Sequence, residues 1–144
     1  LVTGRSGGSV PKLDLAVAPT VFAGVHAAIT QGLVRACHDL SEGGFAVAVA
    51  EMCIAGGIGA DITALPGQLS DEAKLFSESP TRFLVEVKPE NAAAFEAALA
   101  GVPVARVGVT VADPRLRVAG ANGEWLLWVK LATLKEAWQK PLRW

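Results

Sequence analysis

The chain has 144 residues, the length of one ordinary domain, and a domain of that length can bury a core without disulfides or metals. Apolar residues make up 51% of it and charged residues 19%, so it is more apolar and less charged than an average globular domain. The 13 basic and 14 acidic residues are scattered over both halves and leave a net charge of −1, which argues against a nucleic-acid-binding protein.

The first residues and the cysteines bear on whether the chain is part of a longer protein and on the compartment in which it works. The chain begins at Leu1 and its one methionine is Met52, so we expect a processed or excised piece of a longer protein, without a signal peptide. Residues 15–34 carry no charge, but their large apolar side chains recur periodically, which is typical of an amphipathic helix rather than a membrane span. Cys37 and Cys53 lie among apolar residues without zinc or redox spacing, so we expect both as reduced core residues of a cytoplasmic protein.

Apolar patterns and turn residues divide the chain into alternating strands and helices. Residues 1–12, with the Gly- and Ser-rich run 4–9, are expected to be a flexible loop or linker remnant, and residues 13–144 a single domain. Strands are predicted over short apolar or alternating runs: 13–17, 33–37, 58–63, 82–88, 102–111, 116–120 and 124–129. Helices are predicted where apolar residues recur every three or four positions: 19–31, 42–55, 70–77, 89–100 and 131–139.

Several of these elements carry specific signals. Ser70 or Asp71 is a candidate cap of the third helix. The helix over residues 42–55 has only two charged residues, so we expect it to be buried on more than one side. Asn122 and Gly123 form a strong hairpin signal between the last two strands. The order βαβαβαβαβββα predicts an α/β (α+β) fold, a mixed β-sheet with helices packed on it.

The strand-to-helix turn over residues 37–45 reads Cys-His-Asp-Leu-Ser-Glu-Gly-Gly-Phe. Its glycines permit close backbone approach, and the helix start directs unpaired N–H groups and partial positive charge outward, which suits a phosphate. Ser41 is a candidate N-cap, and Asp39 is an alternative. A capped helix start that binds nothing explains the same residues, because the turn lacks both the dinucleotide fingerprint and the lysine of a nucleotide-cradling loop.

The histidines predict neither a metal site nor a catalytic residue. His38 and Asp39 are neighbours on a strand, so their side chains point to opposite faces and do not converge on one ion. The same geometry separates Cys37 from His38 as a nucleophile and its base. His26 lies on a predicted helix with no acidic or cysteine companion nearby. We therefore predict no metal ligands and no catalytic residues in this chain.

A second polar cluster lies between a predicted helix end and a strand, over residues 75–85. It contains Ser77, Glu78, Ser79 and Arg82. Arg82 can bind a phosphate in a bidentate manner, and either serine can donate to its oxygens. An ordinary surface pair between Glu78 and Arg82, of little energetic value, is an equal alternative.

Together, the two clusters resemble phosphoribosylformylglycinamidine synthase. The resemblance is carried by residues 38–44 (His-Asp-Leu-Ser-Glu-Gly-Gly), 46–51, 75–79 (Leu-Phe-Ser-Glu-Ser), 82–83 (Arg-Phe) and 134–138 (Leu-Lys-Glu-Ala-Trp). That enzyme contains two copies of a unit shared with aminoimidazole ribonucleotide synthetase, each with an N-terminal and a C-terminal half. The chain is similar to the second C-terminal half, from residue 13 to residue 138, which implies the aminoimidazole ribonucleotide synthetase C-terminal fold.

The resemblance implies an ATP-dependent amidoligase. In that family, formylglycinamide ribonucleotide, ATP and glutamine-derived ammonia give formylglycinamidine ribonucleotide, ADP and phosphate, with Mg²⁺ on the polyphosphate. The family's catalytic histidine and metal-binding carboxylates lie in the N-terminal halves, so we expect this chain alone to be inactive and to bind no cofactor tightly. In the full enzyme the resemblance implies nucleotide or phosphate contacts by Ser41, Gly43, Gly44, Ser79 and Arg82.

The chain departs from the family pattern at Pro80, where the family usually has Gln after the matching Glu-Ser pair. Proline has neither the side-chain amide nor a backbone donor, so the turn offers a ligand fewer contacts.

The resemblance also implies partners. These are the remaining domains of the same synthase and, in the full complex, a glutaminase and a small accessory subunit, with no nucleic acid and no membrane. Apolar surface left by missing domains favours self-association of the fragment. We expect the two polar turns to share a cleft that neighbouring domains of the full enzyme complete.

Other functions remain open at this point. The chain is alternatively a scaffold or an auxiliary nucleotide-binding module of a related ATP-dependent enzyme, aminoimidazole ribonucleotide synthetase or selenophosphate synthetase. Those relatives usually carry a different glycine-rich turn at the helix start. A plain α/β binding module would leave both motifs to coincidence.

Overall fold

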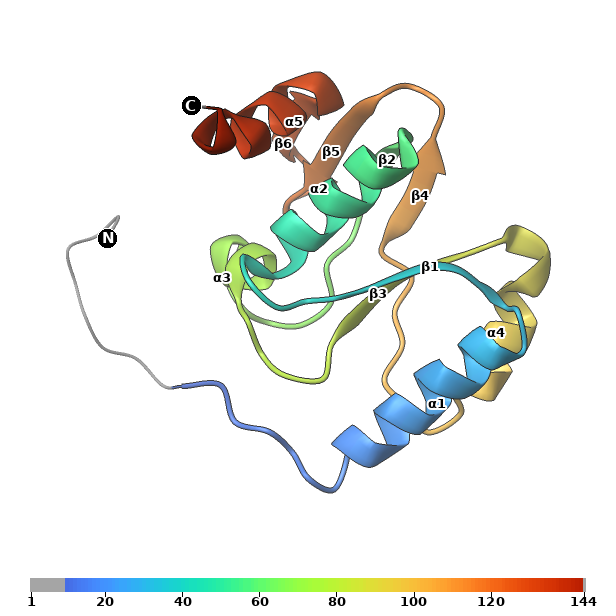
Figure 1. Ribbon diagram of the computed structural model, residues 1–144. Coiled ribbons are helices and arrows are strands. Elements are labelled where there is room, and N and C mark those ends of the chain that lie inside the picture. Colours follow the sequence, from blue (N-terminus) through green and yellow to red (C-terminus); the bar gives the residue numbers. More distant parts are fainter. Residues whose placement is uncertain (1–9, 144) are drawn as a thin grey trace.

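The computed structural model describes residues 10–143, so residues 1–9 of the loop expected over residues 1–12 lie outside the described residues. The helices are α1 (Ala18–Thr30), α2 (Gly44–Gly56), α3 (Asp71–Phe76), α4 (Ala92–Ala98) and α5 (Leu131–Gln139), with 3₁₀ turns at Pro89–Asn91 and Lys140–Leu142 (Figure 1). The strands are β1 (Val34–Asp39), β2 (Gly59–Ile62), β3 (Phe83–Val87), β4 (Gly108–Val111), β5 (Arg115–Ala119) and β6 (Trp125–Lys130). Within residues 10–143, no helix is both long and apolar enough to span a membrane.

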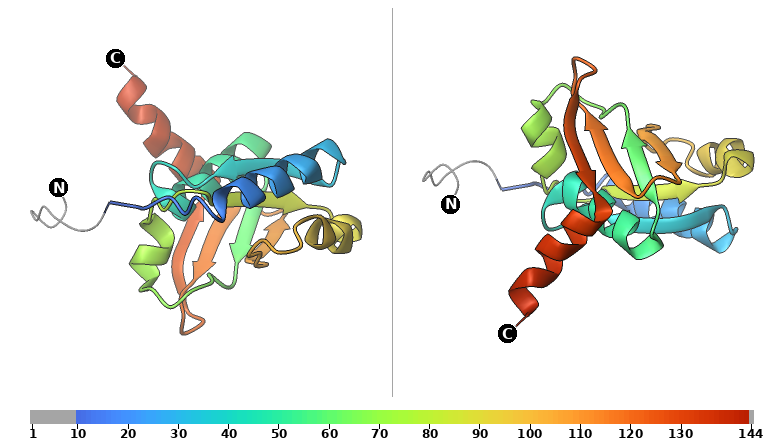
Figure 2. Two further views of the ribbon diagram at one scale, coloured as in Figure 1. Left: turned by 90° about the horizontal axis from the view of Figure 1, so that it is seen from below. Right: turned by 90° about the horizontal axis from the view of Figure 1, so that it is seen from above.

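The strands form two sheets. β1 and β3 pair antiparallel as a two-stranded ribbon, and the other strands form a mixed sheet of order β4-β2-β5-β6, in which β2 runs parallel to β5. Figure 2 shows α5 projecting from the end of β6. The mixed α+β class is confirmed, but the single sheet expected from the sequence is wrong. Apolar patterning identifies strands but not their partners. β1 pairs with β3, whose Phe83 lies opposite Asp39 although it is 44 positions further along the chain.

Helix α2 is the centre of the larger core. Phe45, Ala48, Val49 and Cys53 are buried on it, and they pack with buried residues of β2, β5 and α3. The inner face of the four-stranded sheet supplies Ala60, Ile62, Leu116 and Val118, of which the last two are fully buried. Leu84 of the ribbon packs against the same cluster. The expectation that this helix is buried on more than one side is confirmed.

A smaller core covers the opposite face of the ribbon. Val21, Val25 and Ala28 of α1 pack with Phe95 and Leu99 from the α4 region. On the ribbon, Phe83, Val85 and Val87 complete this cluster. The ribbon therefore lies between α1 and α4 on one face and α2 on the other.

Local signals gave several elements correctly. Ser70 caps α3, because its Oγ accepts the Ala73 N–H at 3.3 Å. The hairpin between β5 and β6 turns at the Asn-Gly pair, where Asn122 Oδ1 accepts the Glu124 N–H at 3.0 Å. Helix α5 has the predicted bounds.

Two predicted strand segments are wrong. Residues 13–17 contain a turn, in which Asp14 Oδ1 accepts the Ala16 N–H at 2.9 Å, and no strand. Of residues 102–111 only β4 is strand, and Pro103, which has no N–H to donate to a ladder, lies in the part that is not.

The two cysteines differ. Cys53 is buried, and burial raises the pKa of its thiol to about 11. Cys37 is exposed, so its predicted core position is wrong. Exposure alternates along β1, and Cys37 falls in the exposed set with Arg35 and Asp39.

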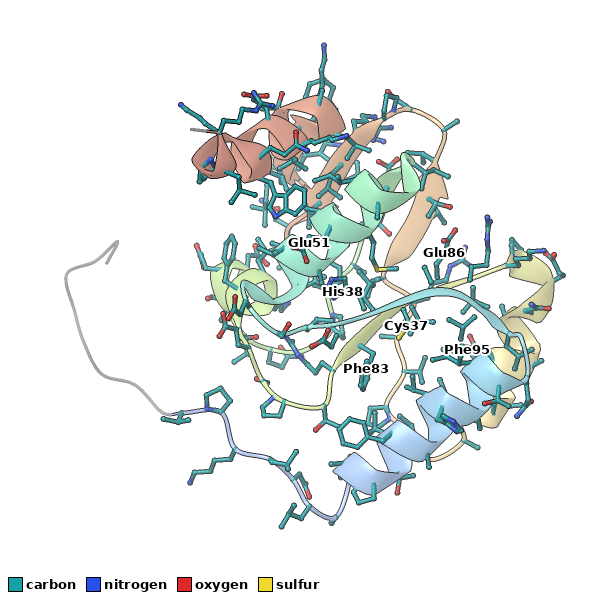
Figure 3. All side chains as sticks on the ribbon, in the orientation of Figure 1. Cys37, His38, Glu51, Phe83, Glu86 and Phe95 are labelled. Carbon is teal, nitrogen blue, oxygen red and sulfur yellow. The ribbon has the colours of Figure 1, made fainter. Side chains whose placement is uncertain are left out.

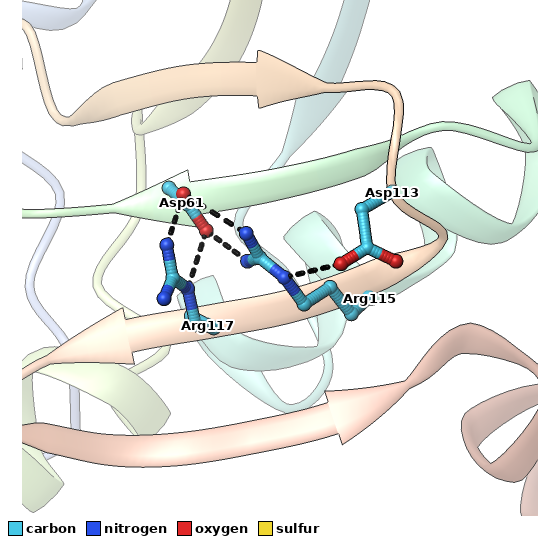
Figure 4. Close-up of polar contacts among 4 residues, drawn as sticks. All are labelled: Asp61, Asp113, Arg115 and Arg117. Atoms are coloured by element: carbon cyan, nitrogen blue, oxygen red, sulfur yellow. Dashed lines mark hydrogen bonds and ion pairs between the residues drawn. The ribbon is translucent and has the colours of Figure 1, made fainter.

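An ion cluster lies on the outer face of the four-stranded sheet (Figure 4). Asp61 of β2 accepts from Arg117 Nε at 2.9 Å and Nη2 at 2.6 Å, and it also pairs with Arg115. Arg115 Nε donates to Asp113 at 2.8 Å, and Arg117 lies 4.2 Å from the Trp125 ring centroid. Hydrogen bonds from Arg117 and Arg115 hold the pKa of Asp61 well below its usual range.

The low folded-state pKa of Asp61 gives the cluster a pH signature. The ionised carboxylate stabilises the fold above the unfolded pKa of about 3.9, and this stabilisation is lost as the pH falls towards the lower folded-state pKa. We predict that Asp61→Asn lowers the free energy of unfolding by about 1–3 kcal/mol at pH 7, and that its deficit relative to wild type shrinks below about pH 4. Urea unfolding at pH 7, 5 and 3 measures both.

The matched control is Asp113→Asn. Its side chain is 64% exposed, so we expect a loss of less than about 0.5 kcal/mol. A deficit for Asp61→Asn that stays constant over the whole pH range would contradict the proposed origin of the stabilisation.

Candidate functional site

The two polar clusters of the sequence lie side by side, and the ribbon brings them together. We call residues 41–44 the helix-start turn and residues 77–82 the pre-strand turn. The first follows β1 and the second precedes β3. Because β1 and β3 are antiparallel, with Asp39 opposite Phe83, both turns lie at the same end of the ribbon. The Leu40 N–H donates to the Arg82 carbonyl at 3.0 Å, which extends the pairing towards the turns.

The turns are joined directly by Glu78. Its Oε1 accepts the Gly43 N–H at 2.8 Å. Next to this bond, the backbone of Gly44 packs so closely that a Cβ there would lie 2.7 Å from the Ser77 carbonyl oxygen and 3.0 Å from that of Leu75. Gly43 and Gly44 have φ of 78° and 62°, a conformation that favours glycine. The two glycines are therefore required by both backbone conformation and contact.

The predicted capping of α2 by Ser41 or Asp39 is wrong. The helix begins at Gly44, two residues later than predicted, its N-cap is Gly43, and no side chain caps it in the usual local way. The Ser41 carbonyl accepts the Gly44 N–H at 3.0 Å, so the Ser41 side chain precedes the first helical turn and is exposed. The carboxylate that accepts the N-cap N–H comes instead from Glu78, far away in sequence.

Arg82 points inward. Its Nη2 donates to the Ser77 carbonyl at 2.6 Å, while Arg82 Nε and Ser77 Oγ are buried without a hydrogen-bond partner among the described residues. Partial burial lowers the pKa of the Arg82 guanidinium from its ordinary value. The surface pair between Glu78 and Arg82, considered as an alternative, is not among the ion pairs of residues 10–143, since Glu78 binds Gly43 instead.

The pre-strand turn contains a strained residue. Thr81 has φ of 67° and is the one non-glycine residue of the described chain with positive φ. A left-handed conformation costs a β-branched residue about 1–2 kcal/mol, and such strain persists only where the surroundings hold it. Pro80 followed by a residue with positive φ is the pattern of a type II turn.

Two separate hollows lie beside the pre-strand turn. Thr81 and Arg82 line an open groove that continues past His38 and Leu40. Ser77, Glu78 and Ser79 line a second open depression beside residues 10–12. The two clusters therefore lie side by side. The open groove is lined by His38 and Leu40 of the first cluster and by Thr81 and Arg82 of the second, whereas residues 41–44 line neither of these two hollows.

His38 is tied to helix α2. Its Nε2 lies 3.0 Å from Glu51 Oε2, and its Nδ1 lies 2.7 Å from the Asp39 carbonyl oxygen; Figure 3 shows the pair between β1 and α2. The pairing of His38 with Glu51, the one charged residue of α2, was not predicted from the sequence. Within the described chain, no group of three or more His, Cys, Asp or Glu residues could hold a metal ion.

The close contact of Gly44 can be tested against a matched glycine. Gly57 has the same left-handed conformation, φ of 64°, but a Cβ there would meet nothing within 4 Å. We predict that Gly57→Ala costs about 1–2 kcal/mol of unfolding free energy, and Gly44→Ala about 2–5 kcal/mol because steric overlap is added. Chemical denaturation of both variants measures the difference, and equal losses would contradict the contact with Ser77.

Similar sequences lie within larger proteins. Residues 2–121 match the family described as AIR synthase related protein, C-terminal domain. The subunit PurL of phosphoribosylformylglycinamidine synthase from Deinococcus radiodurans is 40% identical over 143 residues, which are 99% of this chain and 19% of that protein. The PurL subunit of Alkaliphilus metalliredigens is 37% identical over 144 residues, again 99% of this chain and 19% of that protein. The chain thus spans about a fifth of the length of these curated relatives.

Solved structures share the fold. T. maritima PurL complexed with FGAR superposes with a TM-score of 0.77 at 23% identity, over 92% of this chain and 23% of that one. T. maritima PurL complexed with ATP gives 0.71 at 22% identity, over 80% and 21% of the two chains. The structure of PurLQS from Thermotoga maritima gives 0.73 at 21% identity, over 85% and 22%. The chain therefore belongs to the family of AIR synthase related proteins, as their C-terminal domain.

Proposed function

We propose that this chain is a domain of a phosphoribosylformylglycinamidine synthase. The enzyme would convert formylglycinamide ribonucleotide, ATP and glutamine-derived ammonia into formylglycinamidine ribonucleotide, ADP and phosphate. ATP activates the amide oxygen, and ammonia then displaces that oxygen as phosphate. The observation that carries the proposal is that both sequence motifs of this family meet in one contact, between Glu78 and Gly43. Identity of 40% over 99% of the chain to a PurL subunit supports it.

Within that enzyme the chain would contribute one wall of a nucleotide or phosphate site. The proposed contacts are Ser41, Gly43, Gly44, Ser79 and Arg82. Ser41 and Ser79 are exposed hydroxyl donors, and Arg82 is a partly buried guanidinium that makes no ion pair within the described residues. The Gly43 N–H is already donated to Glu78, so this residue would offer close backbone approach rather than its amide.

The donor set suits ATP and not its metal ion. Hydroxyl and guanidinium donors bind phosphate oxygens, whereas Mg²⁺ needs carboxylate or other oxygen ligands. Residues 10–143 contain no cluster of acidic or histidine side chains suited to a metal. Mg²⁺ would therefore be held by the polyphosphate and by other domains of the enzyme. Neutralising the polyphosphate is the chemistry it would supply, and the chain alone would be inactive.

A scaffold role is the second candidate, and exposed apolar side chains favour it. Phe22, Trp125, Trp128 and Trp138 are between 43% and 57% exposed, which suits surfaces covered in a larger protein. The covering surfaces would be the remaining domains of the synthase, with self-association when these are absent. A glutaminase and a small accessory subunit would complete a cytoplasmic ligase complex, as the PurLQS assembly of Thermotoga maritima suggests for this chain.

Replacement of the matching 143 residues in the Deinococcus radiodurans subunit by this chain tests the proposal. We predict that the chimaeric subunit supports ammonia- and ATP-dependent turnover of formylglycinamide ribonucleotide. If Arg82 belongs to the wall, Arg82→Ala lowers kcat/KM for ATP at least about tenfold, because a charged donor to phosphate is lost. Steady-state kinetics with varied ATP measures this ratio.

Arg35→Ala is the control for loss of an arginine. Its side chain is 56% exposed and lies 3.6 Å from Glu86, so we expect kcat/KM within about twofold of the parent. If Arg82→Ala leaves nucleotide affinity and turnover unchanged, the proposed nucleotide or phosphate contact is contradicted, and the scaffold role remains. A folded chimaeric subunit without any turnover would contradict the synthase assignment.

A further inference from the structure

Glu78 is the point at which the two turns are fastened together, although it is not among the residues proposed to contact a ligand. Its carboxylate reaches the Gly43 N–H at 2.8 Å across 35 residues of sequence. The next two residues, Ser79 and Pro80, are exposed, and Gly43 and Ser79 both belong to the proposed wall, so this bond adjoins the proposed contacts.

Helix α2 depends on this carboxylate because its own start lacks a capping side chain. Two consecutive glycines with φ of 78° and 62° form the start, so no local Ser, Thr, Asp or Asn is placed to accept its first N–H groups. Glu78 supplies an acceptor and negative charge from another element. The position of the first turn of α2 is therefore coupled to the position of the pre-strand turn.

The pre-strand turn is fixed at its other end as well. Arg82 donates to the Ser77 carbonyl at 2.6 Å, and the Arg82 carbonyl accepts the Leu40 N–H at 3.0 Å. Between these anchors, Thr81 is held in a left-handed conformation that it would leave if the turn were loosened. Loss of the Glu78 bond would free the side of the turn that carries Ser79.

We propose that Glu78 is a positioning residue, which acts as a hydrogen-bond acceptor that holds the pre-strand turn and the start of α2 in register, and not as a ligand contact. The effect on catalysis rests on the proposed function, whereas the relative position of the turn and the helix start is a property of this chain. A role in binding Mg²⁺ or a substrate amine would need the negative charge. A role as acceptor needs only an oxygen, which glutamine retains.

The first measurement uses the chain alone and requires no enzyme activity. We predict that amide hydrogen exchange at Gly43, followed by ¹⁵N NMR, becomes at least about tenfold faster in Glu78→Ala and stays within about threefold of wild type in Glu78→Gln. Glu42→Ala is the matched control, because it removes an exposed carboxylate one residue from Gly43 that makes no hydrogen bond within the described chain. Unchanged exchange in Glu78→Ala would overturn the proposal.

The second measurement uses the chimaeric subunit. We predict that Glu78→Ala raises KM for ATP or formylglycinamide ribonucleotide at least about fivefold with a smaller change in kcat, and that Glu78→Gln and Glu42→Ala stay within about twofold of the parent. If Glu78→Gln is as impaired as Glu78→Ala, the positioning role is overturned, and Glu78 instead contacts the ligand through its charge. An inactive parent subunit contradicts only the proposed function, because the exchange experiment still shows whether Glu78 holds the pre-strand turn and the start of α2 together.

Discussion

The antiparallel pairing of β1 with β3 is the constraint on which the proposed site depends. Its register, with Asp39 opposite Phe83, places the turn that leaves β1 beside the turn that enters β3. A two-stranded ribbon is marginally stable by itself, so its position requires cover on both faces. Helices α1 and α4 supply that cover on one face and α2 on the other. The site is therefore built by packing that extends through the whole chain.

Helix α2 connects this ribbon to the four-stranded sheet, which explains its nearly uncharged sequence. A helix that packs on several elements has no broad solvent face on which charges could lie. Its single charged residue, Glu51, meets His38 on the ribbon at 3.0 Å. The same helix begins at the glycine pair beside Glu78. Helix α2 thus links the larger core, the ribbon and the proposed wall, so a displacement of its first turn would reach all three.

Features set by neighbouring residues could be predicted from the sequence, and features set by distant residues could not. The Ser70 cap, the Asn122-Gly123 hairpin and the buried character of α2 depend on residues a few positions apart, and all three are confirmed. The division of the strands into two sheets depends on β1 choosing β3, which periodicity does not encode. Cys37 is exposed despite its apolar neighbours in sequence, because its place in the strand alternation turns its side chain outward. The bond from Glu78 to Gly43 could not be derived from either motif alone.

The bond from Glu78 to Gly43 bears on whether a glycine-rich helix start predicts an anionic ligand. Such a start predicts that negative charge will be found there, because unpaired N–H groups and the helix dipole both favour it. It does not say whether the charge belongs to a ligand or to the protein. In α2 the protein's own Glu78 carboxylate takes the Gly43 N–H, so a second anion at that amide would meet like charge. Arg82, by contrast, carries positive charge, is only partly buried and makes no ion pair within the described residues. The proposed phosphate contact is therefore better placed on the Arg82 side of the pre-strand turn than at the start of the helix.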